Sequence, residues 1–194
     1  MRTIDRMTWR RALPAIVAGL VVVGVVAGCG TTVEGAPQTA GPSTGVNGER
    51  PLTWNPCSDL GSDALLAARV DPAAKETVTD AKSGPVGARM CQWPSTIGPY
   101  SLIVGALTVT LDQWRTNTKI AGIQDVRVGG QSALTFYDKS DPDKLACYVA
   151  LSSPEGSYEI SAGWFYSQRA SLPQAPPCDL AMEYAAGLLP YLPK

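Results

Sequence analysis

The chain has 194 residues, with 16 lysines and arginines against 17 aspartates and glutamates, and it contains no histidine. Without histidine, the usual general base near neutral pH and the commonest metal ligand are missing, so Ser-His-Asp and Cys-His catalysis are excluded in their ordinary forms. Carboxylates, lysines and tyrosines remain available for chemistry. We therefore expect a protein that is not an enzyme and that needs no cofactor and no metal.

The N-terminal stretch has the layout of a secretory signal. Four arginines and one aspartate precede an uncharged run from Ala12 to Gly28, which ends in Val26-Ala27-Gly28-Cys29. A basic start, an apolar stretch and a small-residue cleavage site are typical of exported proteins, and the last four residues resemble the bacterial lipobox. We predict a lipoprotein signal peptide over residues 1–28, with lipid attached to Cys29.

Two alternatives remain at this end of the chain. The first is an uncleaved spanning helix, although the apolar run falls slightly short of the ~20 residues that a span needs. The second concerns the start codon, because Met7 would also give a working signal in place of Met1.

Cleavage before Cys29 would change the charge of the protein. Residues 1–28 hold four arginines and one aspartate, so 12 basic and 16 acidic residues remain, a net charge of −4. Nucleic-acid binding normally requires a basic surface, so we expect no nucleic-acid partner. Membrane attachment is expected to rest on the acyl chains at Cys29, which places the protein on the extracytoplasmic face of the cell membrane.

Residues 29–53 are rich in Gly, Pro, Ser and Thr and poor in large apolar residues. Such a segment cannot bury enough surface to offset its ordering entropy, so we predict a flexible tether that begins with the lipidated Cys29. Gly41-Pro42-Ser43-Thr44-Gly45 matches the G-x-S-x-G nucleophile motif. That motif needs a strand–turn–helix setting and a histidine partner, so we interpret the match as chance.

Residues 54–194 are long enough for a single domain with its own core. Apolar periodicity and turn residues predict helical segments and strands in an alternating order. The helical segments are expected at 59–69, 74–78, 112–119 and 178–189, and the strands at 88–93, 100–111, 125–129, 133–137, 145–151 and 158–165. This order predicts an α+β fold, an antiparallel sheet with helices packed on one face.

The last predicted strand shows the clearest alternation. Tyr158, Ile160 and Trp164 share one face of the strand, whereas Glu159 and Ser161 share the other. This pattern is typical of an antiparallel strand with one buried and one half-exposed face.

Four cysteines remain besides Cys29, namely Cys57, Cys91, Cys147 and Cys178. An even set in an exported protein predicts two disulfides, and a zinc site would need closer pairs. Three connectivities are possible. We favour Cys57–Cys91 and Cys147–Cys178, each of which would join the start of a helix to a strand.

Two residue groups are candidate ligand sites. Asp138, Asp141 and Asp143 offer oxygen ligands for calcium, but they lack EF-hand spacing and a solvated loop is the preferred interpretation. Trp164 with Tyr158, Tyr166 and Tyr148 could wall an apolar pocket. The same aromatic residues would equally fill a core between sheet and helices, which we favour.

The cysteine-containing segments resemble those of a known family. Asn55-Pro56-Cys57, Met90-Cys91-Gln92-Trp93, Ala146-Cys147-Tyr148-Val149 and Pro177-Cys178-Asp179-Leu180-Ala181 follow one another at the spacing found in actinobacterial, largely mycobacterial, lipoproteins of unknown function, the group that includes LprB and LprC. The resemblance implies a cell-envelope lipoprotein and brings no catalytic residues.

These observations favour a lipid-anchored, non-enzymatic domain that binds another envelope protein or a lipid-like ligand. The alternative is a carboxylate-dependent enzyme that acts on cell-wall glycans, which would need two acidic residues in one cleft, roughly 5–9.5 Å apart. A large apolar cavity beside Trp164 would favour lipid binding, and a polar cleft with paired acids would favour catalysis.

Overall fold

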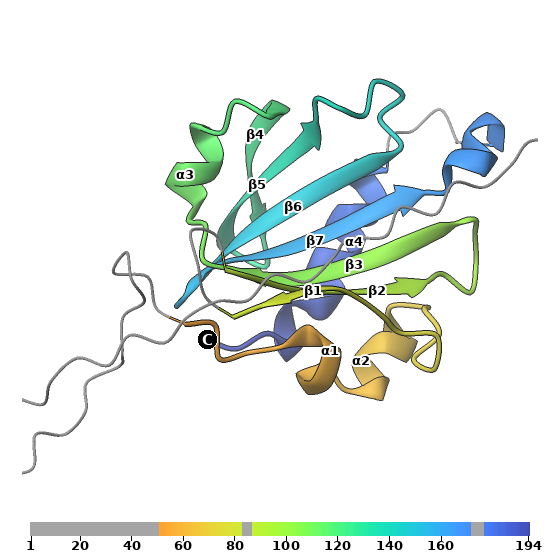
Figure 1. Ribbon diagram of the computed structural model, residues 1–194, viewed down its shortest axis with the longest axis horizontal. Helices are drawn as coiled ribbons and strands as arrows, with labels where there is room; N and C mark the ends of the chain where they lie inside the picture. The colour runs from red at the N-terminus through yellow and green to blue at the C-terminus, as the bar shows by residue number, and fades with distance from the viewer. Residues whose placement is uncertain (1–50, 83–86, 172–176) are drawn as a thin grey trace, which may run out of the picture. The chain divides into compact units, whose positions relative to one another are not determined.

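The computed structural model describes residues 51–82, 87–171 and 177–194. In this part of the chain, seven strands form one antiparallel sheet in the order β1-β2-β3-β7-β6-β5-β4 (Figure 1). The strands are β1 (Glu76–Ala81), β2 (Ala88–Pro94), β3 (Tyr100–Leu107), β4 (Ile120–Val128), β5 (Gln131–Asp138), β6 (Ala146–Ser153) and β7 (Gly156–Trp164). The predicted α+β class with two disulfides is confirmed.

The sheet is built from two runs of sequential hairpins. Strands β1–β3 form the first run, after which the chain passes through helix α3 (Leu111–Arg115) to the far edge and returns as β4–β7. Strand β7 therefore pairs with β3, in a register from Tyr100 opposite Trp164 to Leu107 opposite Ser157. The centre of the sheet thus joins segments that lie far apart in the sequence.

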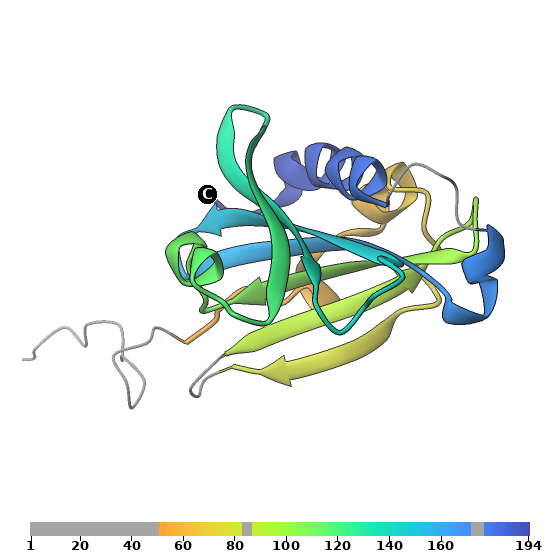
Figure 2. The same cartoon turned by 90° about the horizontal axis from the view of Figure 1, so that it is seen from above.

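Three helices lie on one face of the sheet, as predicted. They are α1 (Pro56–Asp59), α2 (Ser62–Ala67) and α4 (Cys178–Leu188), and Figure 2 shows α4 along one side of the strands. Helix α3 differs, because its Trp114 stacks on Phe136 on the opposite face, with ring centroids 4.8 Å apart. Two 3₁₀ turns, η1 (Tyr166–Ser171) and η2 (Leu189–Tyr191), follow β7 and α4.

The first predicted helix, over 59–69, is wrong in its extent. Asn55 caps α1 by accepting a hydrogen bond from the Cys57 amide at 3.0 Å, so the helix begins earlier than predicted. Gly61 then has extended backbone angles and precedes α2. An extended residue cannot continue a helix, so two short helices replace one long one.

Strand β1 was not predicted, since a helical turn was expected over 74–78. This strand pairs with β2 at the edge of the sheet, from Glu76 opposite Gln92 to Ala81 opposite Ala88. Almost every residue of β1 is exposed. With no buried face, the strand lacks the apolar alternation on which the prediction depended.

Strands β4 and β5 are joined by a tight hairpin turn. Gly129 and Gly130 join β4 to β5 with φ values of +56° and +85°. Two consecutive positive φ values match the twist of antiparallel strands, and glycine adopts them without a Cβ clash.

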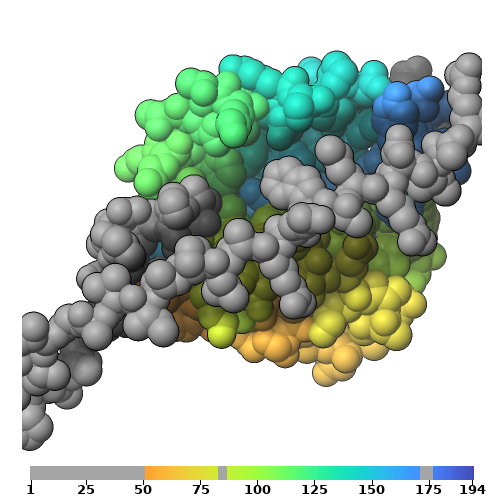
Figure 3. Space-filling view, viewed as in Figure 1, coloured from red at the N-terminus to blue at the C-terminus, as the bar shows by residue number. Residues whose placement is uncertain are grey.

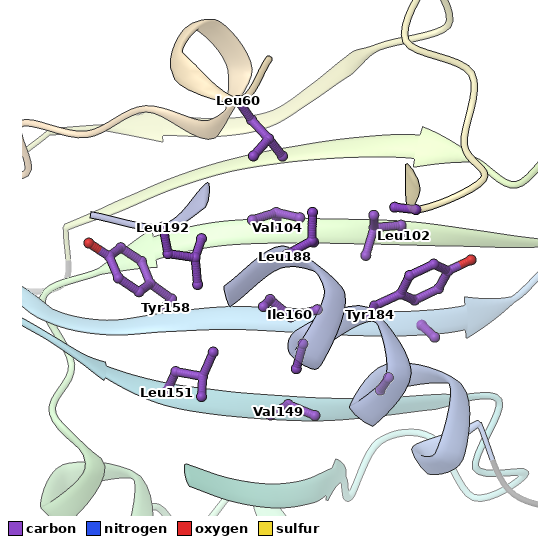
Figure 4. Close-up of a cluster of buried hydrophobic side chains, with 14 of the residues drawn as sticks. Leu60, Leu102, Val104, Val149, Leu151, Tyr158, Ile160, Tyr184, Leu188 and Leu192 are labelled. Atoms are coloured by element: carbon purple, nitrogen blue, oxygen red, sulfur yellow. The ribbon is translucent and has the colours of Figure 1, made fainter. Parts of the chain in front are cut away.

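The main core lies between the helices and the sheet. Leu102 and Val104 of β3, Ile160 of β7 and Val149 of β6 point from the sheet toward Leu188 of α4 (Figure 4). All five side chains are essentially inaccessible to solvent. In α4, Ala181 and Ala185 are also fully buried, and these small residues let the helix approach the strands closely.

The two disulfides connect helix starts to strands in the favoured pairing. Cys57 of α1 is bonded to Cys91 of β2 with the Cα atoms 5.3 Å apart, and Cys147 of β6 is bonded to Cys178 of α4 with a Cα separation of 4.9 Å. Cys91 and Cys147 are completely buried, so each bridge ties a helix directly to the core.

Candidate functional site

A cavity of about 670 Å³ lies where two hairpin turns meet the C-terminal segment. Leu189 and Leu192 provide apolar surface beside the ring of Tyr158, and Gln131 and Ser153 add polar groups from the two turns. This volume falls within the range of small-molecule sites, which are mostly apolar with a few polar groups that orient the ligand. The Tyr158 cavity, defined by these five residues, is one candidate binding site.

Tyr158 holds the wall of this cavity in place. Its hydroxyl donates to the Pro193 carbonyl at 3.2 Å, and its ring meets Trp54 edge-on with centroids 5.1 Å apart. Burial, together with the nearby charge of Glu155, raises the pKa of Tyr158 to about 12. The hydroxyl is therefore neutral and serves as a structural hydrogen-bond donor.

The start of the domain is fixed beside the same cavity. The Glu155 carboxylate, in the turn between β6 and β7, accepts hydrogen bonds from the Thr53 amide at 3.1 Å and from the Thr53 hydroxyl. Thr53 is the last residue of the predicted tether. The Tyr158 cavity therefore lies at the end of the domain where the tether joins it.

An adjacent hollow of about 560 Å³ contains two acidic residues, Asp112 and Glu155. Asp112 pairs with Arg115, the nitrogen and oxygen lying 2.7 Å apart, while Glu155 binds Thr53. Asp112 is fully open to solvent, with a side chain 93% exposed. Both carboxylates are thus engaged in contacts that a carboxylate-dependent enzyme would have to break.

Glu159 forms a second candidate site, on the face opposite α4. It lies opposite Gly105 of β3 and Ala150 of β6, and Ala150 belongs to the small core around Trp114 and Phe136. The residue is only 5% exposed, and burial raises the pKa of its carboxyl from 4.5 to about 7. No described residue gives this carboxyl a hydrogen bond or an ion pair.

The aromatic residues considered as a pocket wall are not brought together. Trp164 stacks on Tyr100 with centroids 4.6 Å apart, and Tyr148 stacks on Phe136 at 5.4 Å on the opposite face. Tyr166 lies in η1, 65% exposed, with Arg169 over its ring. Tyr158 lines the cavity described above, at the end of β7 away from Trp164.

The aspartates of the β5–β6 connection serve the turn itself. Asp138 accepts from the amide and the hydroxyl of Ser140, both at 2.7 Å, and these bonds lower the pKa of Asp138. Asp141 accepts from the Ala146 amide at 2.9 Å, and Asp143 is exposed. In the described ranges, no three His, Cys, Asp or Glu side chains are grouped so as to hold a metal ion.

A family model described as "Protein of unknown function (DUF3558)" matches residues 24–191. The chain belongs to this family. No curated protein and no solved structure matches the chain.

The DUF3558 match includes Cys29 and all seven strands of the sheet. The predicted signal peptide, the lipid attachment at Cys29, the Gly41–Gly45 motif and the tether up to residue 50 lie outside the described residues. No helix within the described ranges is both long and apolar enough to cross a membrane.

For this DUF3558 protein, sequence reasoning named Tyr158 as a candidate pocket-wall residue but grouped it with other partners than those of the cavity, and it missed the Glu159 site. The Tyr158 cavity depends on how two turns meet the C-terminal segment, and no local pattern reports that arrangement. Glu159 did carry a signal, because it is an acidic residue within an otherwise uncharged strand.

Proposed function

We propose that this protein is a lipid-anchored cell-envelope protein that binds an apolar or amphipathic ligand in the Tyr158 cavity. The cavity carries the proposal, because its volume and its surface of leucines, proline and tyrosine suit an acyl or similar chain. Two disulfides agree with an oxidising, extracytoplasmic location. The lipobox-like residues before Cys29 support the anchor.

A bound ligand should be detectable by native mass spectrometry after gentle extraction of the full-length protein. We expect an adduct on the wild-type protein and its loss in Leu189→Glu, because a carboxylate in an apolar cavity repels an acyl chain. Leu66→Glu is the matched control, since Leu66 lies on α2, away from the cavity, and is already 61% exposed. A wild-type protein without an adduct, or equal loss in both variants, would contradict the proposal.

The anchor has its own test. Cys29→Ser removes the thiol that accepts the lipid, so we expect the protein to leave the membrane fraction and to lose the acyl mass. If the Cys29→Ser protein loses the acyl mass but stays in the membrane fraction, the result would instead support the spanning-helix alternative. Fractionation and intact-mass measurement on the same sample separate the two results.

A carboxylate-dependent glycan hydrolase remains the second candidate, because Asp112 and Glu155 line one hollow. The engagement of both carboxylates with Arg115 and Thr53 favours a binding protein over an enzyme.

A further inference from the structure

The face of the sheet opposite α4 carries a line of small and polar residues along its centre. On β7 these are Ser157, Glu159 and Ser161, and beside Glu159 the neighbouring strands contribute Gly105 and Ala150. We call these five residues the Glu159 site. All five are buried, yet the residues on both sides of Glu159 have almost no side chain that could reach its carboxyl.

Larger side chains stand around the Glu159 site. On the β2 side, Met90 lies over Gly105, since a Cβ added to that glycine would meet Met90 Cγ at 2.9 Å. On the β6 side, Tyr148 stands next to Ala150 and stacks in parallel on Phe136. Figure 3 views the domain from this side, with the α3–β4 region (green) and the β5–β6 region (teal) along its upper border.

The hydrogen bonds near Glu159 do not involve its carboxyl. Trp114 Nε1 donates to Ser157 Oγ at 3.0 Å, so the single donor of this indole is already engaged and does not bind Glu159. The nearest basic residue on β2, Arg89, lies on the other face, where it binds Asp80 at 2.7 Å and the Thr53 carbonyl. In the described part of the protein, Glu159 is therefore a buried carboxyl without a donor.

A buried carboxylate without a donor is strongly unfavourable, and a cation compensates it best. The groups around it are the side chains of Met90, Tyr148 and the two serines of the site, so a ligand must pair a positive head with an apolar body. We propose that the Glu159 site binds an organic ammonium group carried on an apolar chain. Met90 is flexible and partly exposed, and its movement would give the ligand access to the carboxyl.

The electrostatic environment agrees with this assignment. The charge of Glu159 contributes, after burial, to raising the pKa of the Tyr148 hydroxyl to about 12. Tyr148 therefore stays neutral and does not compete for the cation. The charges of Asp138 and Asp141 raise the pKa of Tyr148 further but more weakly, and no described lysine or arginine shifts the pKa of Glu159.

The probe for this site is n-pentylamine, with the isosteric 1-pentanol as the neutral comparison. Both would be titrated into the full-length, disulfide-bonded protein at pH 8, with Kd measured by calorimetry. We expect the amine to bind at least tenfold more tightly than the alcohol, and Glu159→Gln to weaken amine binding tenfold or more. Glu76→Gln, an exposed change on the edge strand β1, should leave the Kd unchanged.

Three results would overturn the proposal: no amine binding, equal binding of amine and alcohol, or equal amine binding by wild type and Glu159→Gln. A measurement on the wild-type protein avoids dependence on any variant. The Glu159 carboxyl ¹³C resonance should titrate at lower pH when n-pentylamine is present, because the cation favours the ionised form. An unchanged titration would also count against an ammonium site.

Discussion

Glu159 is an ionisable residue that the fold buries without a partner for its charge. Its side chain lies on a face where its nearest neighbours are Gly105 and Ala150, so it is only 5% exposed and no described residue pairs with its carboxyl. The folded state therefore favours the protonated carboxyl more than the unfolded chain does, which is why the pKa rises to about 7. A group with this property makes stability depend on pH.

The sign of that dependence follows from the raised pKa. Below pH 4.5 the carboxyl is protonated in both states and imposes no penalty. As pH rises from 4.5 to 7, the unfolded chain loses the proton first, so stability falls, and above pH 7 the loss is complete. The free energy of unfolding falls by at most roughly 3 kcal/mol through this effect.

Glu159→Gln should remove this loss. We expect the variant to be more stable than wild type at pH 8 by about 1–3 kcal/mol, and nearly equal at pH 4, since glutamine keeps the size but not the charge. Urea unfolding at the two pH values measures the difference. Glu76→Gln should show no such change, and a Glu159→Gln effect of equal size at both pH values would refute the raised pKa.

The sequence predicted the orientation of Glu159 but not its burial. The two-residue period placed Glu159 and Ser161 together on the face away from Tyr158, and the pairing with β3 and β6 agrees. That face was expected to be half-exposed. Its burial depends on what other parts of the chain place over the face, as Met90 lies over the neighbouring Gly105, and the alternation within one strand contains no information about them.

At the scale of the elements, the two disulfides attach helices α1 and α4 to the sheet. The bridge from Cys147 to Cys178 joins the start of α4 to β6, and the Tyr137 hydroxyl lies 3.0 Å from Cys178 Sγ. The bridge from Cys57 to Cys91 attaches the four-residue helix α1 to β2. A helix so short is not stable in isolation and depends on its contacts with the rest of the fold, of which this bridge is one.

Replacing Cys147 and Cys178 together by alanine should lower the free energy of unfolding by roughly 3–4 kcal/mol, because the open chain regains the entropy of a loop of about 31 residues. Equilibrium unfolding in urea gives the value. Cys57→Ala with Cys91→Ala opens a loop of similar length, 34 residues, and should have a similar effect. A change below 1 kcal/mol in both double variants would show that the bridges do not constrain the unfolded chain.

The elements that the sequence predicted well are those with one buried face. Helix α4 was predicted over 178–189 and spans Cys178–Leu188, because its apolar residues repeat with the helical period. Strand β1 and the break at Gly61 were missed, since an edge strand without a buried face and a single extended residue leave no periodic signal. The side on which α3 packs depends on Trp114 meeting Phe136 and Ser157, a contact between distant residues.

At the scale of the whole domain, the strand order divides the sheet into two parts of the chain. The first contains α1, α2 and β1–β3, and the second contains α3, β4–β7 and α4. They meet where β3 pairs with β7 and where α2 contacts α4. The apolar residues of both parts, among them Leu102 and Ile160, form one continuous core across that junction.

Each disulfide closes a loop inside one of these parts, and neither crosses the junction between β3 and β7. The peptide bonds between Leu107 and Leu111 are consequently the sole covalent link, within the described residues, between two cross-linked fragments. A single cut there would leave two chains, each with its own bridge, joined by strand pairing and a shared core. Cleavage at this link would therefore turn the domain into a non-covalent complex of two different chains.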